Sequence, residues 1–195
     1  GAIFTSGSAS NYAITYVDGA LTIAGQASQT ISFTAPASKV YGDAAIALAA
    51  TSSSELPVSF TLVSGLASLS GSTLTITGVG SVVVKASQAG NTNYSAAADV
   101  QQTIAVSARA LTITANNANR AFGAANPVTP GFTAPGLVTG DVISGVSYTY
   151  AATATSTAAV GTTHAITPSG AIFTSGSASS YAITTNNIIS AGVCN

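Results

Sequence analysis

Apolar and polar residues alternate in several short segments of the chain, and turn-forming residues separate these segments. Residues 72–77 and 110–114 place Leu and Ile at every second position with Thr between them. This period of two is typical of a strand with one buried and one solvated face. The same pattern predicts further strands at residues 57–62, 81–85 and 102–106.

Two segments rich in small residues can be read in two ways. Residues 43–50 contain enough Ala for a helix by propensity, yet Ile46 and Leu48 lie two positions apart and follow a Tyr-Gly-Asp sequence. Residues 151–160 carry Thr at every second position from Thr153. We interpret both segments as strands because a period of two fits them better than a helical period.

Internal repeats divide the chain. Residues 1–15 return as residues 170–184 with one difference, Asn11 against Ser180. A weaker repeat relates the stretch that ends at Lys39-Val-Tyr-Gly42 to the one that ends at Arg120-Ala-Phe-Gly123. Repeats of this kind indicate tandem modules.

Short strands separated by frequent turns indicate antiparallel β-sandwiches. We therefore predict an all-β chain with tandem immunoglobulin-like sandwiches at residues 26–107 and 108–195. Residues 1–25, with a hairpin signal at Asp18-Gly19, are expected to be the closing hairpin of a preceding repeat. Alternatively, they donate strands to a neighbouring chain.

Two tyrosines follow similar Gly/Ser/Asn-rich loops. Tyr94 follows residues 90–93, and Tyr181 follows residues 176–180. We expect each ring to point inward at the start of the penultimate strand of its sandwich. The placement is similar to the tyrosine corner, in which the hydroxyl bonds back to the main chain. A simple β-propensity of Tyr explains the same pattern.

Several motifs resemble one family of modules. They are Tyr16-Val-Asp-Gly-Ala-Leu-Thr-Ile23, Lys39-Val-Tyr-Gly-Asp43, Leu56-Pro-Val-Ser-Phe60, residues 86–94 and residues 111–117. In these stretches the chain is similar to the MBG and bacterial Ig-like repeats of large secreted surface proteins and adhesins. The resemblance implies a stalk module outside the cell. Phe122-Gly123 replaces the usual Tyr-Gly, and residues 185–195 replace the expected Asp-Gly hairpin.

Composition narrows the range of partners. The 195 residues include four Lys and Arg and five Asp and Glu, so charged residues make up 5% and the net charge is −1. A chain with so few cations lacks the basic face that nucleic acid requires and cannot coat an anionic membrane surface. No apolar run reaches the length of a membrane-spanning helix. We expect neither nucleic acid nor membrane insertion.

Few side chains are able to perform chemistry. His164 is the only His, Glu55 the only Glu and Cys194 the only Cys. A catalytic triad would need His164 beside a Ser or Thr and an Asp, but its alternating segment favours an ordinary strand position. Asp43 and Asp141 are the candidates for a cation, and both favour turn formation instead. We therefore expect no enzyme activity, no cofactor and no metal site.

Two patterns offer binding surfaces. The Thr rows at residues 73–77 and 153–157 could order water as on an ice-binding face, and the seven Tyr and six Phe could form a sugar platform. Wetted strand faces and core packing explain both patterns as well. The expected function is a structural segment of a bacterial surface stalk, adhesin or fibre, secreted or at the cell surface. Its expected partners are neighbouring repeats or copies of itself, and the alternative is a glycan- or ice-binding module.

Overall fold

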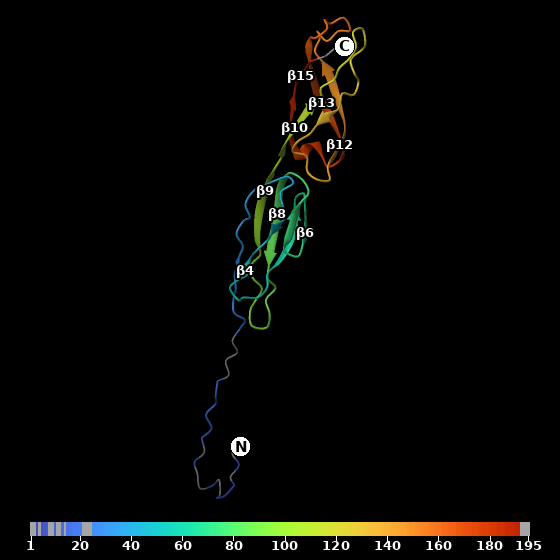
Figure 1. Ribbon diagram of the computed structural model, residues 1–195. Coiled ribbons are helices and arrows are strands. Elements are labelled where there is room, and N and C mark those ends of the chain that lie inside the picture. The colour runs from blue at the N-terminus through green and yellow to red at the C-terminus, as the bar shows by residue number, and fades with distance from the viewer. Residues whose placement is uncertain are drawn as a thin grey trace.

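The computed structural model describes residues 25–191 and, ahead of them, residues 3, 5–7, 10, 13 and 15–20. Within these residues the regular structure is β-strand, apart from a short 3-10 turn, η2, at Ala178–Ser180 and one 3-10 position at Ser10. Figure 1 shows two lobes that lie end to end. We call residues 26–107 the first unit and residues 108–191 the second unit.

The strands of the first unit form a sandwich of two main sheets. One sheet has the order β2-β9-β8-β5, the other has the order β3-β7-β6, and β1 pairs with β4 at the side. The strands are β1 (Ile31–Ser32), β2 (Lys39–Val40), β3 (Ile46–Ala47), β4 (Thr51–Ser52), β5 (Ser59–Ser64), β6 (Ala67–Ser70), β7 (Thr73–Ile76), β8 (Gly80–Ser87) and β9 (Val100–Ser107).

The second unit is also built from two sheets. Their orders are β11-β10-β14 and β12-β13-β15. The strands are β10 (Arg109–Ala115), β11 (Phe132–Thr133), β12 (Val142–Tyr150), β13 (Thr163–Ser175), β14 (Tyr181–Asn186) and β15 (Ile188–Ala191). The prediction of an all-β sandwich fold is confirmed. The boundaries proposed at residues 26, 107 and 108 remain predictions.

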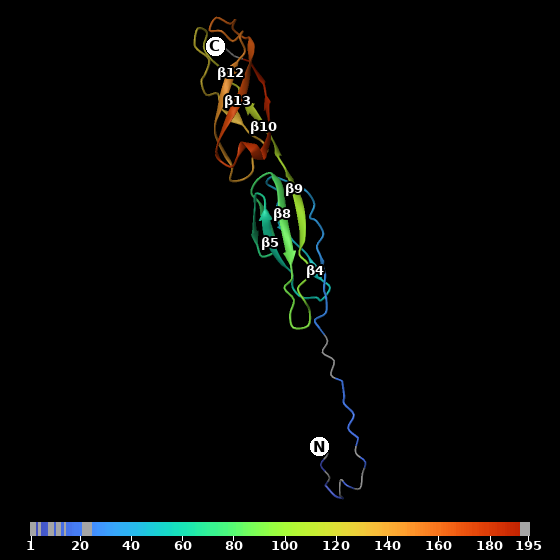
Figure 2. The ribbon, with the colours of Figure 1, turned by 180° about the vertical axis from the view of Figure 1, so that it is seen from behind.

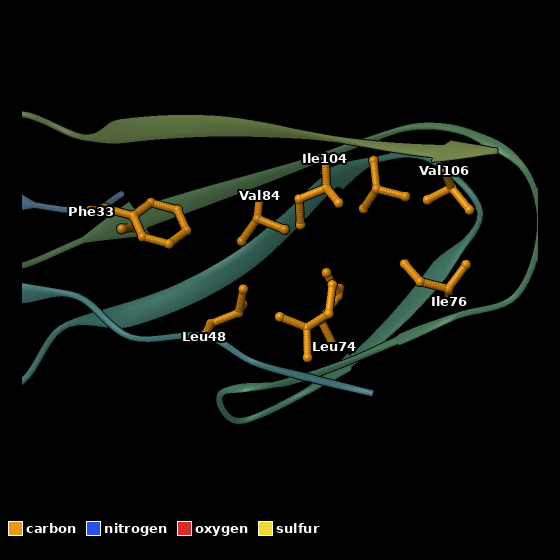
Figure 3. Packing of buried hydrophobic residues seen from close by; sticks show 10 residues of the cluster. Phe33, Leu48, Leu74, Ile76, Val84, Ile104 and Val106 are labelled. Atoms are coloured by element: carbon orange, nitrogen blue, oxygen red, sulfur yellow. The ribbon is translucent and has the colours of Figure 1, made fainter. Parts of the chain in front are cut away.

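The core of the first unit lies between its two main sheets. Val84 on β8 and Ile104 on β9 face Leu74 on β7, and all three side chains are fully buried. Figure 3 shows Phe33 at one end of this layer of side chains and Ile76 and Val106 toward the other. Burial alternates strictly along β7, as the Thr-Leu-Thr-Ile sequence predicts. Apolar burial from both sheets therefore holds this sandwich together.

In each unit an early strand pairs in parallel with a strand near the end of the unit. β2 pairs with β9 through Lys39 and Val106, and β10 pairs with β14 from Arg109–Tyr181 to Thr114–Asn186. Purely antiparallel sheets were expected from the short spacing of the strands. A parallel pair requires a long crossover, and here the rest of each sandwich provides it.

The structure shows how the two segments with ambiguous sequence patterns fold. The prediction for residues 43–50 is partly right, because β3 occupies Ile46–Ala47. The predicted strand at residues 151–160 is wrong, because this segment is a series of turns. Hydrogen bonds from Ala154 N to Ala151 O and from Ala158 N to Thr155 O close them. Residues 151–159 are all Ala, Thr or Ser, and Val160 is 61% exposed, so no large apolar side chain is buried here to fix the segment in a sheet.

The predicted hairpin at residues 12–23 falls partly outside the described residues. Of its residues, the structure describes 13 and 15–20, which belong to no strand and are exposed. The prediction that residues 1–25 close a preceding repeat therefore stays a prediction.

Candidate functional site: the joint between the two units

The two units are joined by one residue. β9 ends at Ser107 and β10 begins at Arg109, so only Ala108 lies between the strands. Figure 2 shows β9 running into β10 where the lobes meet. A connection this short limits how far the units can separate, and the contacts beside it decide their orientation.

The first unit presents a tight turn to this joint. Tyr41 and Gly42 are its central residues, and Asp43 N donates to Val40 O at 3.0 Å. The Asp43 carboxylate accepts from Val40 N at 2.9 Å, so the expectation that Asp43 forms a turn is confirmed. Gly42 has a φ of 83°, which is in the region that favours glycine.

Tyr41 is buried in the core of the second unit. Its side chain is 8% exposed and belongs to the cluster that contains Leu111 and Tyr181. The Tyr41 ring meets the Tyr181 ring edge-on, with centroids 5.5 Å apart, and Phe173 stacks on Tyr181 at 5.6 Å. Each such aromatic pair contributes about 0.5–1.5 kcal/mol beyond area burial. One unit therefore inserts an aromatic anchor into the other.

Asp141 connects the two tyrosines. Its Oδ2 accepts a hydrogen bond from the Tyr41 hydroxyl at 3.1 Å and another from the Tyr181 hydroxyl. The Tyr181 oxygen in turn accepts from Val138 N at 3.0 Å. Hydrogen bonds to a charged group contribute about 1.5–3 kcal/mol each. The carboxylate thus ties the first unit to the second through a small polar network.

Arg109 forms hydrogen bonds to both units at the joint. Its Nη1 donates to Tyr41 O at 3.4 Å and its Nε donates to Gly136 O at 3.1 Å. Tyr41 N donates to Ser107 O at 3.0 Å. The main chain of the turn is therefore held at the end of β9 while its side chain enters the second unit.

The environment of the joint keeps both tyrosines neutral. Burial is the largest cause that raises the pKa of Tyr181 to about 12, and the bond to Asp141 raises it further while the Val138 N–H opposes the shift. Burial and the bond to Asp141 also raise the pKa of Tyr41 above its ordinary value. Both hydroxyls therefore remain donors to the carboxylate at neutral pH.

The tyrosine prediction holds for one residue of the two. Tyr181 is 6% exposed and opens β14, and its hydroxyl accepts from the main chain, although from Val138, which is 43 residues upstream and not a few residues away as in a tyrosine corner. Tyr94 is half-buried and lies outside β9, in an isolated bridge with Ala27. The loop of Tyr94 is followed by an irregular stretch before β9 begins, so this ring does not enter the core.

His164 lies on β13 among hydroxyl groups. Its Nδ1 is 3.0 Å from Thr153 Oγ1, and its Nε2 is 3.0 Å from Thr162 Oγ1. It borders a cavity of about 50 Å³ whose walls include Arg120 and Tyr150. Both ring nitrogens have hydrogen-bond partners, and these partners explain the half-buried His without a ligand.

The other candidates for chemistry are scattered. Among the described residues, no three His, Cys, Asp or Glu side chains gather as metal ligands would. Cys194 lies outside the described residues. In that same part of the chain, no helix combines the length and the apolar character that crossing a membrane would take.

The two binding patterns are placed differently. Thr73 and Thr75 on β7 are exposed, whereas residues 153–157 lie in turns and form no flat row. Most described aromatic rings are buried or half-buried, and Tyr16 and Phe122 are exposed.

Sequence reasoning missed the Tyr41–Asp141–Tyr181 network. It recognised Tyr41-Gly42 as a motif and Tyr181 as an inward ring, but it assigned Asp141 only to a turn. One signal could have found the network: the chain has only five Asp and Glu, so a hydrogen-bond partner could have been sought for each of them. Asp141 does close a turn, since its N donates to Val138 O at 3.0 Å.

Comparison with known proteins gives one finding. A search of the curated proteins finds no match to the chain. Residues 111–188 match the family model of the MBG domain (YGX type). The match covers most of the second unit, confirms the resemblance to MBG modules there and indicates a module of a surface protein.

Proposed function

We propose that this chain is a spacer segment of an extracellular bacterial stalk, adhesin or fibre. It is secreted or held at the cell surface, and it sets the distance and direction between other parts of the assembly. It acts without catalysis, cofactor or metal, and its partners are neighbouring modules of the same kind.

The joint is the observation that carries this proposal. A spacer must transmit orientation, and a flexible linker would not do so. Here the linker is the single residue Ala108. Tyr41 of the first unit is anchored on Tyr181 and Asp141 of the second. These contacts favour one relative orientation of the two sandwiches.

Strand pairing in the second unit supports a load-bearing role. β10 enters at the joint and pairs in parallel with β14 from Arg109–Tyr181 to Thr114–Asn186. When one force pulls β10 toward the first unit and another pulls the far end of the second unit away from it, the hydrogen bonds between the two strands are sheared. All of these bonds then carry the force together. Such loading resists separation better than opening a ladder one bond at a time.

Small-angle X-ray scattering tests the rigid joint. The wild-type profile should fit two sandwiches in one fixed orientation. Tyr41→Ala removes the anchor and should give a profile that only an ensemble of orientations fits. Val63→Ala, which truncates an exposed side chain on β5, is the matched control. A wild-type profile that already requires an ensemble would refute the spacer proposal.

The proposed location is tested on cells. An antibody raised against the chain should label intact bacteria that carry the protein, and brief protease treatment of those intact cells should remove the label. Labelling that appears only after lysis would contradict an extracellular role.

A further inference from the structure

The second unit carries its own copy of the turn that forms the joint. Phe122 and Gly123 are its central residues, and Ala124 N donates to Ala121 O at 3.1 Å, as Asp43 N does to Val40 O at 3.0 Å. The φ of Gly123 is 82° and that of Gly42 is 83°. Both turns therefore have the same backbone geometry and present an aromatic residue at the same place.

The surroundings of the two turns are opposite. Tyr41 is 8% exposed because the second unit covers it, whereas Phe122 is 61% exposed. A Cβ on Gly42 would lie 2.4 Å from Val138 of the second unit, while a Cβ on Gly123 would meet nothing within 4 Å. Single exposed apolar side chains are normal on a protein surface, so what distinguishes Phe122 is that its turn matches the one that carries Tyr41. The first turn shows what such an aromatic does when a module sits on it.

The turn lies at the end of the second unit that faces away from the first. The segments of residues 116–131 and 151–162 form the loops at the far end of the upper lobe in Figure 1. Gly123 N donates to Ser156 O at 3.0 Å and so connects the two loops. The end with Phe122 is therefore free to receive another module in line with the first two.

The sequence indicates which module would sit there. Residues 170–184 belong to β13, η2 and β14 of the second unit. Their near-identical copy, residues 1–15, precedes the first unit and is separated from it by residues 16–25. The order along the chain is thus a second-unit segment followed by a first unit. The end of the first unit that faces away from the joint carries the loop of residues 88–97, seen at the lower end of the lower lobe in Figure 1.

The chemistry of the two ends agrees with this pairing. Tyr41 offers a hydroxyl, and its partner end offers the Asp141 carboxylate. Phe122 has no hydroxyl, and residues 88–97 contain no charged side chain. An apolar ring against an uncharged loop leaves no carboxylate buried without a partner.

We propose that the Phe122–Gly123 turn is a docking site for the first unit of another copy of this chain, which binds through its loop of residues 88–97. This inference rests on the proposed spacer function and specifies its partner. The contact is head to tail, so it extends an array in one direction.

Cysteine cross-linking of the full chain tests the pairing. One variant carries Ala121→Cys beside the aromatic, and the other carries Thr92→Cys in the loop; both replaced residues are exposed, and both variants also carry Cys194→Ser. The two are mixed under mild oxidation at about 1 mM, near the effective concentration of covalently joined modules. Intact mass spectrometry separates the mixed dimer from the two homodimers because their masses differ.

The expected result is a mixed dimer that exceeds each homodimer by about tenfold, the factor that corresponds to about 1.4 kcal/mol of preferential association. Adding Phe122→Ala should remove the excess without lowering the thermal midpoint, whereas Phe122→Tyr should keep it. Val63→Cys in place of Ala121→Cys should give no excess.

Dimers in statistical proportions, or an excess that survives Phe122→Ala, would overturn the docking site. The scattering test of the joint within one chain is independent of this outcome. Failure of the docking site would therefore leave the spacer proposal standing, and failure of the scattering test would be recognised separately.

Discussion

Replacing Gly42 and Gly123 by alanine compares two similar turns, of which only the first lies against another unit. Both substitutions place a Cβ on a residue with φ near +82°, which costs about 1–2 kcal/mol. The Gly42 variant adds a contact, because its Cβ would lie 2.4 Å from Val138 Cγ2. Relieving such overpacking costs about 1–3 kcal/mol more. Gly42→Ala should therefore be the more destabilising of the two by that second amount.

Urea unfolding of both variants measures this difference. A second-site change identifies its cause: Val138→Ala removes the methyl group that the new Cβ meets, so Gly42→Ala with Val138→Ala should recover most of the extra loss. The double variant is compared with Val138→Ala alone, since truncating Val138 has its own cost. Scattering on the same samples shows whether Gly42→Ala opens the joint.

Equal losses for Gly42→Ala and Gly123→Ala, within about 0.5 kcal/mol, would refute the reasoning. They would mean that the second unit does not press on the turn. Failure of Val138→Ala to restore stability would have the same meaning.

Three other predictions concern how stability depends on pH, on the core and on salt. The pKa of Tyr181 rises from 10.0 in the unfolded chain to about 12 in the folded one, so the Tyr181 hydroxyl keeps its proton to a higher pH in the folded state. Its contribution to stability is complete below about pH 10 and disappears as the pH rises to about 12; urea unfolding across this range should show the decline, and Tyr181→Phe should make it shallower. Leu74→Ala removes a fully buried side chain and should cost about 2–5 kcal/mol in the same assay, with Thr75→Ala on the exposed face as a near-neutral control. The Lys85–Asp99 ion pair is 2.9 Å long and its side chains are 33% and 45% exposed, so the thermal midpoint should change by no more than a few degrees between low salt and about 0.5 M NaCl; a larger shift would show that charge matters more than burial.

The alternation of side chains predicted the strands of the first unit well. Val82, Val84 and Leu74 are buried at the positions that a period of two assigns. Such a pattern is local and depends on one strand at a time. The parallel pairing of β10 with β14 joins residues far apart in sequence, and no local period encodes it. Composition misled the prediction at residues 151–160, since alternating Ala and Thr fits a strand, but the segment's large apolar residue, Val160, is exposed and does not fix it in a sheet.

The joint was harder to predict for a related reason. Tyr41 and Asp141 are far apart in the sequence and belong to different units, so no motif contains both. Asp141 was correctly placed in a turn, whereas Tyr41 was recognised only as part of a motif, and nothing in the sequence pointed either side chain toward the other unit. Arg109 gave no signal at all, because a single basic residue at the start of a strand usually faces solvent.

The low charge of the chain explains why the joint contains an aspartate. Most of the chain consists of Ser, Thr, Ala and Gly, and two surfaces rich in such side chains would have several nearly equivalent arrangements when pressed together. Asp141 accepts one hydroxyl from each unit, and a rotation about the long axis would break at least the bond from Tyr41. A charge left with fewer partners in a half-buried place raises the energy of every rotated arrangement. A single carboxylate therefore gives the joint its directional preference, whereas the aromatic rings around it supply most of the contact.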